Sequence, residues 1–434
     1  MRTAFLLLLF LAVLGRTVGA TQAGVLGWTW LTLMTPHQLS WGFITEAPLN
    51  LLIAIVTLLA WFMSREPKRM PLDAPIVICV LFIVFVTFTT FFALAPDLAW
   101  PRWNLAVKVM ILGLVVASVM ITPIRIHALV WVIVLSLGYY GVKGGLFTIL
   151  TAGQFRVLPA PQSVGDNNTL AVALCMVLPL MNYLRLNSGN RFVRIGSIPA
   201  MGLTAVGVLG TYSRGGVIGL TVMGIYLWWK SKNRFLIALI ALVIAVPAYT
   251  LMPSKWTERM ATIETASADT SFQTRLHAWQ IQVNIAMARP FIGGGFNASQ
   301  APAVHQKYNH DASFDKIVAI AAHSIYFEVL GDHGFIGLVL YLLMLWSTWR
   351  CAGTTRRLVR REPQLRWVGD LTSMIQVSLV SFLVAGAALS MAYYDMVYLL
   401  LGVAVSLRNI VMQSIGEAQV NTPTANALVS APSQ

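Results

Sequence analysis

The sequence has 434 residues, of which 57% are hydrophobic and only 11% are charged. This composition excludes a soluble globular protein and predicts an all-α integral membrane protein. The formal charge of +14 would suggest a nucleic-acid partner in a soluble chain, but a membrane protein carries such an excess in its cytoplasmic loops, so we expect membrane lipid and no nucleic acid as a partner. Three widely separated cysteines favour neither disulfides nor a thiolate metal site, and we expect no metal and no cofactor.

The first 36 residues form an apolar segment with two interpretations. Residues 1–20 have the basic start, apolar stretch and small-residue end of a signal peptide, but the apolar run continues through GWTWLTLM. We favour one retained, irregular span over a cleaved signal peptide.

Eleven further apolar runs approach the length of about 20 residues that a membrane-spanning helix needs. They lie near residues 48–63, 73–94, 103–121, 126–142, 167–186, 196–211, 213–229, 234–251, 323–347, 371–390 and 393–411. With the N-terminal span, the sequence predicts about twelve transmembrane helices. About nine spans fall within residues 1–251 and three within residues 323–411.

Positive charge is concentrated in alternate loops. Counting Arg2 and Arg408, 18 of the 30 Lys and Arg residues fall on one side of the predicted membrane, together with five acids. This side is expected to be cytoplasmic and to hold both termini, because Lys and Arg are enriched in cytoplasmic loops. Residues 412–434 are polar and lack periodicity, which predicts a disordered cytoplasmic tail.

On the opposite side, residues 252–322 form the longest connection and the one extramembrane stretch large enough to fold. We expect it to form short helices that cap the bundle, because it contains an amphipathic run. The apolar residues of that run, roughly at helical spacing, are Leu276, Trp279, Val283, Ile285 and Met287.

Basic residues on the outer side run against the topological bias, and each requires an anionic partner or a structural explanation; seven of them are candidates for an anion site. They are Arg102, Lys108, Lys143, Arg156, Arg214, Arg275 and Arg289. In TYSRGG, residues 211–216, the turn is so short that the Arg214 guanidinium must lie at the membrane boundary. Two arginines on one face suit a phosphate or pyrophosphate, because each guanidinium presents a planar fork of donors. The alternatives are snorkelling to lipid headgroups for Arg214 and an exposed helix-end charge for Arg275.

A second motif, AAHSIYFEVLGDHGFIG at residues 321–337, joins the long outer segment to an apolar helix. We expect His323 to start this helix, with Tyr326 beside it, and a neutral histidine there can take a proton from a sugar hydroxyl. The alternative is a helix-start histidine bonded to local backbone. His333 is interpreted as part of a turn, and Asp166 is either a site residue or the cap of the helix that follows it.

The order of these motifs resembles that of the O-antigen ligase and polymerase superfamily. The resemblance is carried by S-R-G-G at 213–216, Arg275 with Trp279, P-x-x-G-G-G-F at 290–296, and H-S-x-Y-F-E-x-L-G-x-x-G-F-I-G at 323–337. Upstream, residues 135–157 and 163–174 resemble the branch of exosortase-associated O-glycosylation ligases. Ser324 departs from the pattern, since many relatives have asparagine there.

The resemblance implies a GT-C-like glycosyltransferase of the bacterial inner membrane with its active site at the periplasmic face. Such enzymes move a glycan from undecaprenyl pyrophosphate to an acceptor, which in ligases is a lipid A-core sugar. By resemblance, Arg214 and Arg275 hold the donor pyrophosphate and His323 is the general base of an inverting, metal-independent reaction. Further candidate site residues are Arg102, Lys108, Asp166, Tyr212, Arg289 and Tyr326.

Other functions remain open at this point. Within the superfamily, the alternatives are an O-antigen polymerase and a ligase whose acceptor is a protein. A lipid-linked sugar transporter or flippase is the alternative from a different class, but transport predicts paired half-chain repeats, which the sequence does not show. The sequence does not determine the acceptor, the glycan repeat or the oligomeric state.

Overall fold

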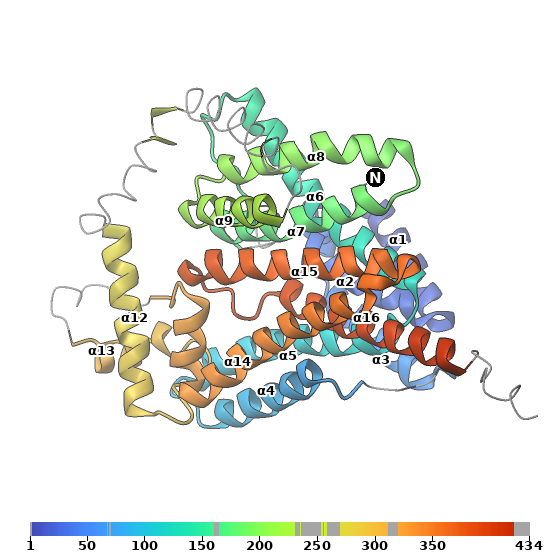
Figure 1. Ribbon diagram of the computed structural model, residues 1–434. Helices are drawn as coiled ribbons and strands as arrows, with labels where there is room; N and C mark the ends of the chain where they lie inside the picture. Colours follow the sequence, from blue (N-terminus) through green and yellow to red (C-terminus); the bar gives the residue numbers. More distant parts are fainter. Residues whose placement is uncertain are drawn as a thin grey trace, which may run out of the picture.

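The computed structural model describes residues 2–66, 68, 71–159, 165–230, 235, 253–254, 256–257, 270–310 and 320–420. Within these residues the regular structure is entirely helical, and nine helices are long and apolar enough to cross a membrane (Figure 1). The protein is thus an all-α integral membrane protein. The α-helices are α1 (Arg2–Gly19), α2 (Thr21–Met34), α3 (Leu49–Met63), α4 (Ala74–Phe91), α5 (Pro96–Val119), α6 (Pro123–Leu150), α7 (Asn167–Asn187), α8 (Arg191–Gly210), α9 (Arg214–Lys230), α12 (Thr270–Ala288), α13 (Pro302–Tyr308), α14 (Ile325–Leu358), α15 (Arg366–Ala385) and α16 (Asp395–Val420).

The predicted apolar runs from residue 48 onward coincide with helices, apart from the run at 234–251, which lies outside the described residues. The total of twelve spans therefore stays a prediction. Helices α5 and α6 are longer than predicted, so Arg102 and Lys143 lie on helices and not in loops. In α6 the extension packs on α8, where a Cβ on Gly145 would lie 2.0 Å from the Leu203 carbonyl oxygen.

Helix α16 also continues past the predicted end of the last span. It reaches Val420, so residues 412–420 are helical and are not a disordered tail. Residues 421–434, the rest of the predicted tail, lie outside the described residues.

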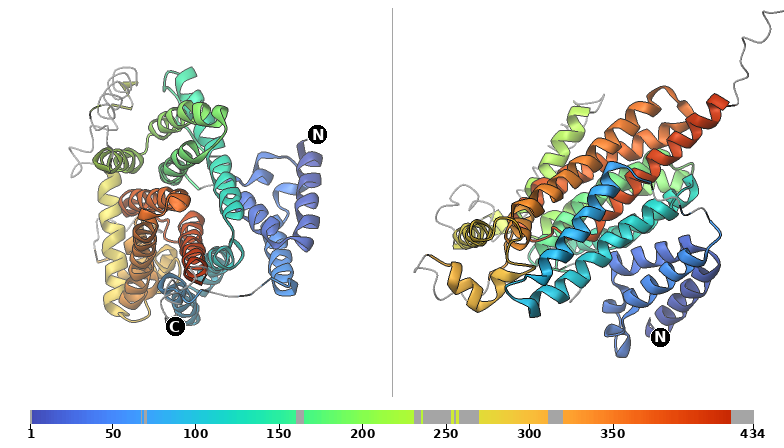
Figure 2. Two further views of the ribbon diagram at one scale, coloured as in Figure 1. Left: turned by 45° about the vertical axis from the view of Figure 1, so that its right-hand side comes forward. Right: turned by 90° about the horizontal axis from the view of Figure 1, so that it is seen from below.

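The N-terminal segment forms two helices where we predicted one irregular span. The chain turns at Ala20 and α2 runs back along α1, because Gly27 faces Val13 and Gly24 faces Thr17. A Cβ on either glycine would lie 2.5 Å from its partner's side chain, so only glycine permits this spacing. Figure 2 shows α1–α3 grouped beside the rest of the bundle.

Two ion pairs hold together one end of the bundle, which we call the basic face. Arg125, at the start of α6, contacts both carboxylate oxygens of Glu66 at 2.6 and 2.8 Å. Arg408 in α16 pairs with Asp73 at 2.9 Å. The opposite end, where α7 and α9 begin, is called the site face below.

Arg2 lies at the site face, which contradicts the predicted position of the N-terminus. It lines a cavity together with Lys143 and Arg156. The α1–α2 hairpin adds one more passage of the chain before α3, and this carries residue 2 to the end opposite Arg125. The prediction that both termini lie on the basic face is therefore wrong for the N-terminus.

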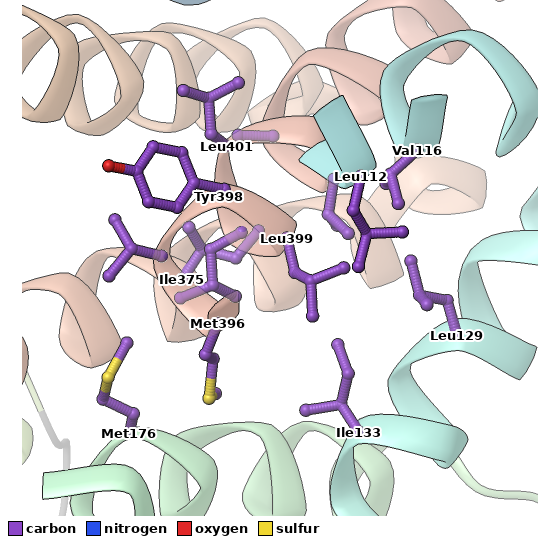
Figure 3. Close-up of a cluster of buried hydrophobic side chains, with 14 of the residues drawn as sticks. Leu112, Val116, Leu129, Ile133, Met176, Ile375, Met396, Tyr398, Leu399 and Leu401 are labelled. Carbon is purple, nitrogen blue, oxygen red and sulfur yellow. The ribbon is translucent and has the colours of Figure 1, made fainter. Parts of the chain in front are cut away.

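Helix α16 lies at the centre of the apolar core. Figure 3 shows Met396 of α16 among side chains from α5, α6, α7 and α15. Two glycines let α5 and α16 cross closely. A Cβ on Gly113 would lie 2.6 Å from the carbonyl oxygen of Tyr398, and a Cβ on Gly402 would lie 2.4 Å from the carbonyl oxygen of Gly113. This packing fixes the segment before α16, residues 386–394, which reaches the site face.

We expect cysteines at Arg2 and Lys307 to react with a membrane-impermeant thiol reagent from one side of the membrane, and a cysteine at Arg357 from the other. All three substituted positions are exposed, whereas the native cysteines are buried and give little background. Labelling of intact cells and of inverted vesicles measures the side. If Arg2→Cys is labelled from the same side as Arg357→Cys, the placement of α1 is wrong. The intact mass of the purified protein separately shows whether residues 1–20 are retained.

Candidate functional site

Arg214 is the first residue of α9 and follows a turn of only three residues after α8. Ser213 caps α9, because its hydroxyl oxygen accepts a hydrogen bond from the Gly216 backbone N–H at 3.1 Å. Gly216 also lies against α7, where a Cβ would be 2.6 Å from that of Ala171. The short turn and this close packing hold Arg214 at the end of the bundle.

Tyr212 stabilises the same turn from its other side. Its backbone is left-handed, with φ of 60°, and its hydroxyl donates to the carbonyl oxygen of Gly153. The Arg156 guanidinium lies 5.9 Å from its ring centroid. These contacts give Tyr212, a predicted site residue, a role in holding the turn.

Asp166 caps α7, as one of its two interpretations predicted. One carboxylate oxygen accepts from the backbone N–H and the hydroxyl of Thr169 at 2.8 and 2.9 Å, and the other accepts from the Asn168 amide at 2.9 Å. Burial raises the pKa of Asp166, but these hydrogen bonds outweigh it and leave the pKa below its ordinary value. The carboxylate therefore stays ionised at neutral pH.

Arg275 is positioned by α12, a 19-residue helix that contains the predicted amphipathic run. Trp279, one turn after Arg275, stacks on Phe327 at a centroid distance of 5.0 Å. This contact joins α12 to the start of α14. The predicted apolar stripe is only partly buried, since Leu276 and Met287 are 38% and 68% exposed.

The glycine-rich loop after α12 docks on a break in α14. At the break, Gly334 has φ of 69° and ψ of −168°. The Gly294 N–H donates to the Gly331 carbonyl oxygen at 2.8 Å, and the Phe335 N–H donates to that of Pro290 at 2.8 Å. A Cβ on Gly334 would lie 2.5 Å from the Pro290 carbonyl oxygen, so glycine is required by both conformation and space.

Arg214 and Arg275 line one small pocket at the site face. Asn168, Ser213 and Leu389 also contribute to it. Because α7 and α9 both begin at this pocket, the positive ends of two helix dipoles add to the two guanidinium charges. The positive charge of the pocket thus favours an anionic ligand.

His323 lies beside this pocket but does not start α14, which corrects our prediction. It precedes the helix, which begins at Ile325, and has a left-handed backbone with φ of 47°. Its backbone N–H donates to the Ser390 hydroxyl at 2.8 Å, and the preceding Leu389 lines the pocket. The segment between α15 and α16 therefore holds His323 beside the pocket that the two arginines line.

The surroundings of His323 favour its neutral form. Burial is the main cause that lowers the pKa of its imidazole, and the positive charge of Arg275 lowers it further. The negative charge of Asp166 acts in the opposite direction and only partly offsets them. The side chain can therefore accept a proton at neutral pH.

Two family models match the sequence. Residues 199–342 match the family described as O-antigen ligase. This region belongs to the O-antigen ligase family. Residues 1–188 match a family of unknown function. No curated protein matches the chain.

The O-antigen ligase region contains Arg214, Arg275 and His323, in agreement with the resemblance seen in the sequence. Together with the membrane-spanning helices, it indicates a membrane enzyme of the ligase and polymerase type, whose general substrates are a lipid-linked glycan and an acceptor. Residues outside this region also contribute to the pocket. Asn168 belongs to the part of the chain matched by the second family, and Ala388 and Leu389 lie beyond both matches, next to Ser390.

Two other predicted site residues have structural partners. Arg102 lies 3.4 Å from Glu328, whose other carboxylate oxygen accepts from the Ala392 N–H at 2.9 Å. Arg289 donates to the Phe92 carbonyl oxygen at 2.8 Å. The first contact joins α5 to α14, and the second joins the residues that directly follow α12 and α4.

Lys108 and Tyr326 do not lie at the pocket. Lys108 is about three turns into α5, roughly 18 Å from its start, and makes no ion pair with a described residue. The Tyr326 hydroxyl donates to the Leu383 carbonyl oxygen at 2.9 Å, which joins α14 to α15. No motif in the sequence indicates a role for Asn168 or Ser390, and Ser390 is 67 residues from His323 in the chain.

The sequence predicts that His333 is part of a turn, and the helix does break at the next residue, Gly334, but His333 itself is a buried core residue. Its side chain is fully buried. The Nδ1 atom is 2.7 Å from the Thr89 hydroxyl oxygen, and the centroid of the imidazole ring is 4.4 Å from that of the Phe296 ring. Replacing His333 with a smaller residue leaves a cavity, and it leaves the Thr89 hydroxyl without this hydrogen-bond partner.

We expect His333→Ala to destabilise the protein by about 2–4 kcal/mol, because packing around a buried ring and a buried hydrogen bond are lost together. Thermal unfolding in detergent and the yield of monodisperse protein measure the effect. His310→Ala is the matched control, since His310 is exposed at the same face. Equal melting temperatures for the two variants would show that His333 contributes nothing to packing.

Proposed function

We propose that this protein is an O-antigen ligase that moves a glycan from undecaprenyl pyrophosphate to a sugar hydroxyl of lipid A-core at the periplasmic face of the inner membrane. The observation that carries the proposal is the convergence of Arg214 and Arg275 on one pocket beside His323. Three motifs far apart in the sequence supply an anion site and a base at one end of the bundle.

In this proposal, the arginines bind the donor pyrophosphate and stabilise the charge that develops on it as it leaves. Each guanidinium can engage two phosphate oxygens at once, and the helix N-termini of α7 and α9 add to the positive potential. Neutralisation by these groups needs no divalent cation. We therefore expect activity to survive chelation of divalent metals.

His323 acts as the general base on the acceptor. It removes the proton from the sugar hydroxyl while the hydroxyl oxygen bonds to the anomeric carbon of the glycan. The bond between that carbon and the pyrophosphate oxygen breaks, and its electrons leave with the pyrophosphate. Attack from the side opposite the leaving group inverts the anomeric configuration.

The same pocket is compatible with two other acceptors, a growing O-antigen chain and a protein hydroxyl, which give a polymerase and a protein O-glycosylation ligase. All three activities share the donor and the base. A transporter needs a path to both faces. The pocket lies at one face only, which supports the enzyme over a lipid-linked sugar flippase.

We expect Arg214→Lys and Arg275→Lys each to lose transition-state stabilisation of about 2 kcal/mol or more, because lysine keeps the charge but loses the planar fork of donors. Glycan transfer from a lipid-linked donor measures this. Arg191→Lys is the matched control, since Arg191 is exposed at the start of α8 on the basic face. Full activity of both pocket variants would place the donor site elsewhere.

We expect His323→Ala to lower turnover by roughly 100-fold or more while donor binding changes little, since general-base assistance contributes 10²–10⁴-fold. Turnover and binding of the lipid pyrophosphate are measured separately. His310→Ala serves as the control for loss of an imidazole at this face. A loss of donor affinity in proportion to the loss of rate would make His323 a binding residue.

The pH dependence follows from the lowered pKa of His323. We expect turnover to fall only in acid, below about pH 6.5, because the imidazole must be neutral to accept a proton. Asp166→Asn removes a charge that raises this pKa, and asparagine still caps α7, so the acidic limb should move to lower pH. An acidic limb that moves upward in this variant contradicts the base assignment.

A further inference from the structure

A long apolar groove runs beside α6, away from the pocket of Arg214 and Arg275. Its walls are α2 and α8, and α6 and α7 form its floor; we call it the α6 groove. Figure 2 shows α6 between the N-terminal helices and α8. The cavity has a volume of about 990 Å³, at the upper end of the range for ligand sites.

The α6 groove faces the bilayer. Leu135, Leu146 and Leu150 of α6 are 62%, 46% and 83% exposed, and Phe192 at the edge of α8 is 84% exposed. Such apolar exposure is expected where a helix contacts lipid chains, and the groove therefore opens to the membrane interior. Its occupant has to be mainly apolar.

The site-face end of the α6 groove is basic. Lys143 and Phe147 line both the groove and a second cavity, which also contains Arg2 and Arg156. None of the described residues that line this second cavity is acidic. Three cations thus gather at the mouth of an apolar groove, at the end of the bundle where lipid headgroups lie.

This basic end is separate from the pocket of Arg214 and Arg275. The two cavities share no lining residue. The Tyr212 ring lies 5.9 Å from the Arg156 guanidinium, and Tyr212 directly precedes Ser213 of the pocket. The groove therefore offers a second anion site with its own apolar compartment. Basic pockets between transmembrane helices are typical binding sites for anionic lipid headgroups.

We infer that the α6 groove binds an anionic phospholipid of the surrounding membrane, with its phosphate at Arg2, Lys143 and Arg156 and its acyl chains along α6. Charge complementarity selects the anionic headgroup, and the opening to the membrane admits a lipid from the bilayer. Because α8 leads directly into the turn at Arg214, an occupied groove also supports the helix that positions this arginine. The inference does not depend on the proposed reaction.

The test uses the full-length protein in nanodiscs of phosphatidylcholine and phosphatidylglycerol at 4:1, with co-purifying lipid counted by native mass spectrometry after transfer to detergent. We expect phosphatidylglycerol to be enriched at least fivefold on the protein over its share in the nanodisc. The double variant Lys143→Gln/Arg156→Gln should lose that enrichment. Arg191→Gln/Arg194→Gln, two exposed arginines at the opposite end of α8, should keep it.

A second variant tests the apolar part without changing a charge. Gly196 lines the groove, and a Cβ there meets no atom within 4 Å, so Gly196→Phe fits on α8 but fills the groove. Gly196→Phe should also lower the amount of phosphatidylglycerol that stays bound.

Absence of enrichment in the wild type, or equal loss in both double variants, would overturn the inference. Preferential retention of added polyprenyl phosphate over phosphatidylglycerol would assign the groove to the carrier lipid and would overturn it too.

Discussion

The docking of the 290–297 loop on the broken helix α14 is the constraint on which the site depends. Backbone hydrogen bonds from Gly294 and to Pro290 saturate the groups that the break at Gly334 exposes, which is necessary in a low-dielectric environment. Because α12 runs straight into this loop, its register against α14 is fixed. That register brings Trp279 onto Phe327 and carries Arg275 to the level of His323.

The two guanidinium groups and the imidazole come from different elements, and the backbone around each residue sets where it lies. Tyr212 and His323 both adopt left-handed backbone conformations, which cost free energy and persist only when their surroundings impose them. The Ser390 hydroxyl and the Gly153 carbonyl oxygen supply those surroundings. The fold therefore fixes the backbone at both positions.

The basic residues at the site face fall into two groups: some connect parts of the bundle, and others line cavities. Arg102 pairs with Glu328, and Arg289 donates to the backbone carbonyl oxygen of Phe92. Both arginines therefore connect one part of the helix bundle to another. Arg214 and Arg275 share a pocket, and Arg156 belongs to the mouth of the α6 groove. Sequence position alone makes these residues look alike, since all of them violate the same topological bias.

Sequence by itself determined the membrane class, the positions of most helices, the Asp166 cap and the family, because apolar run length, cap chemistry and motif order are local properties. Only the tertiary structure decided that α1 and α2 form a hairpin, since their spacing depends on glycines that meet across the turn. It likewise decided that His333 is buried and that Ser390 holds His323. Such contacts join residues far apart in the chain, and no local pattern records them.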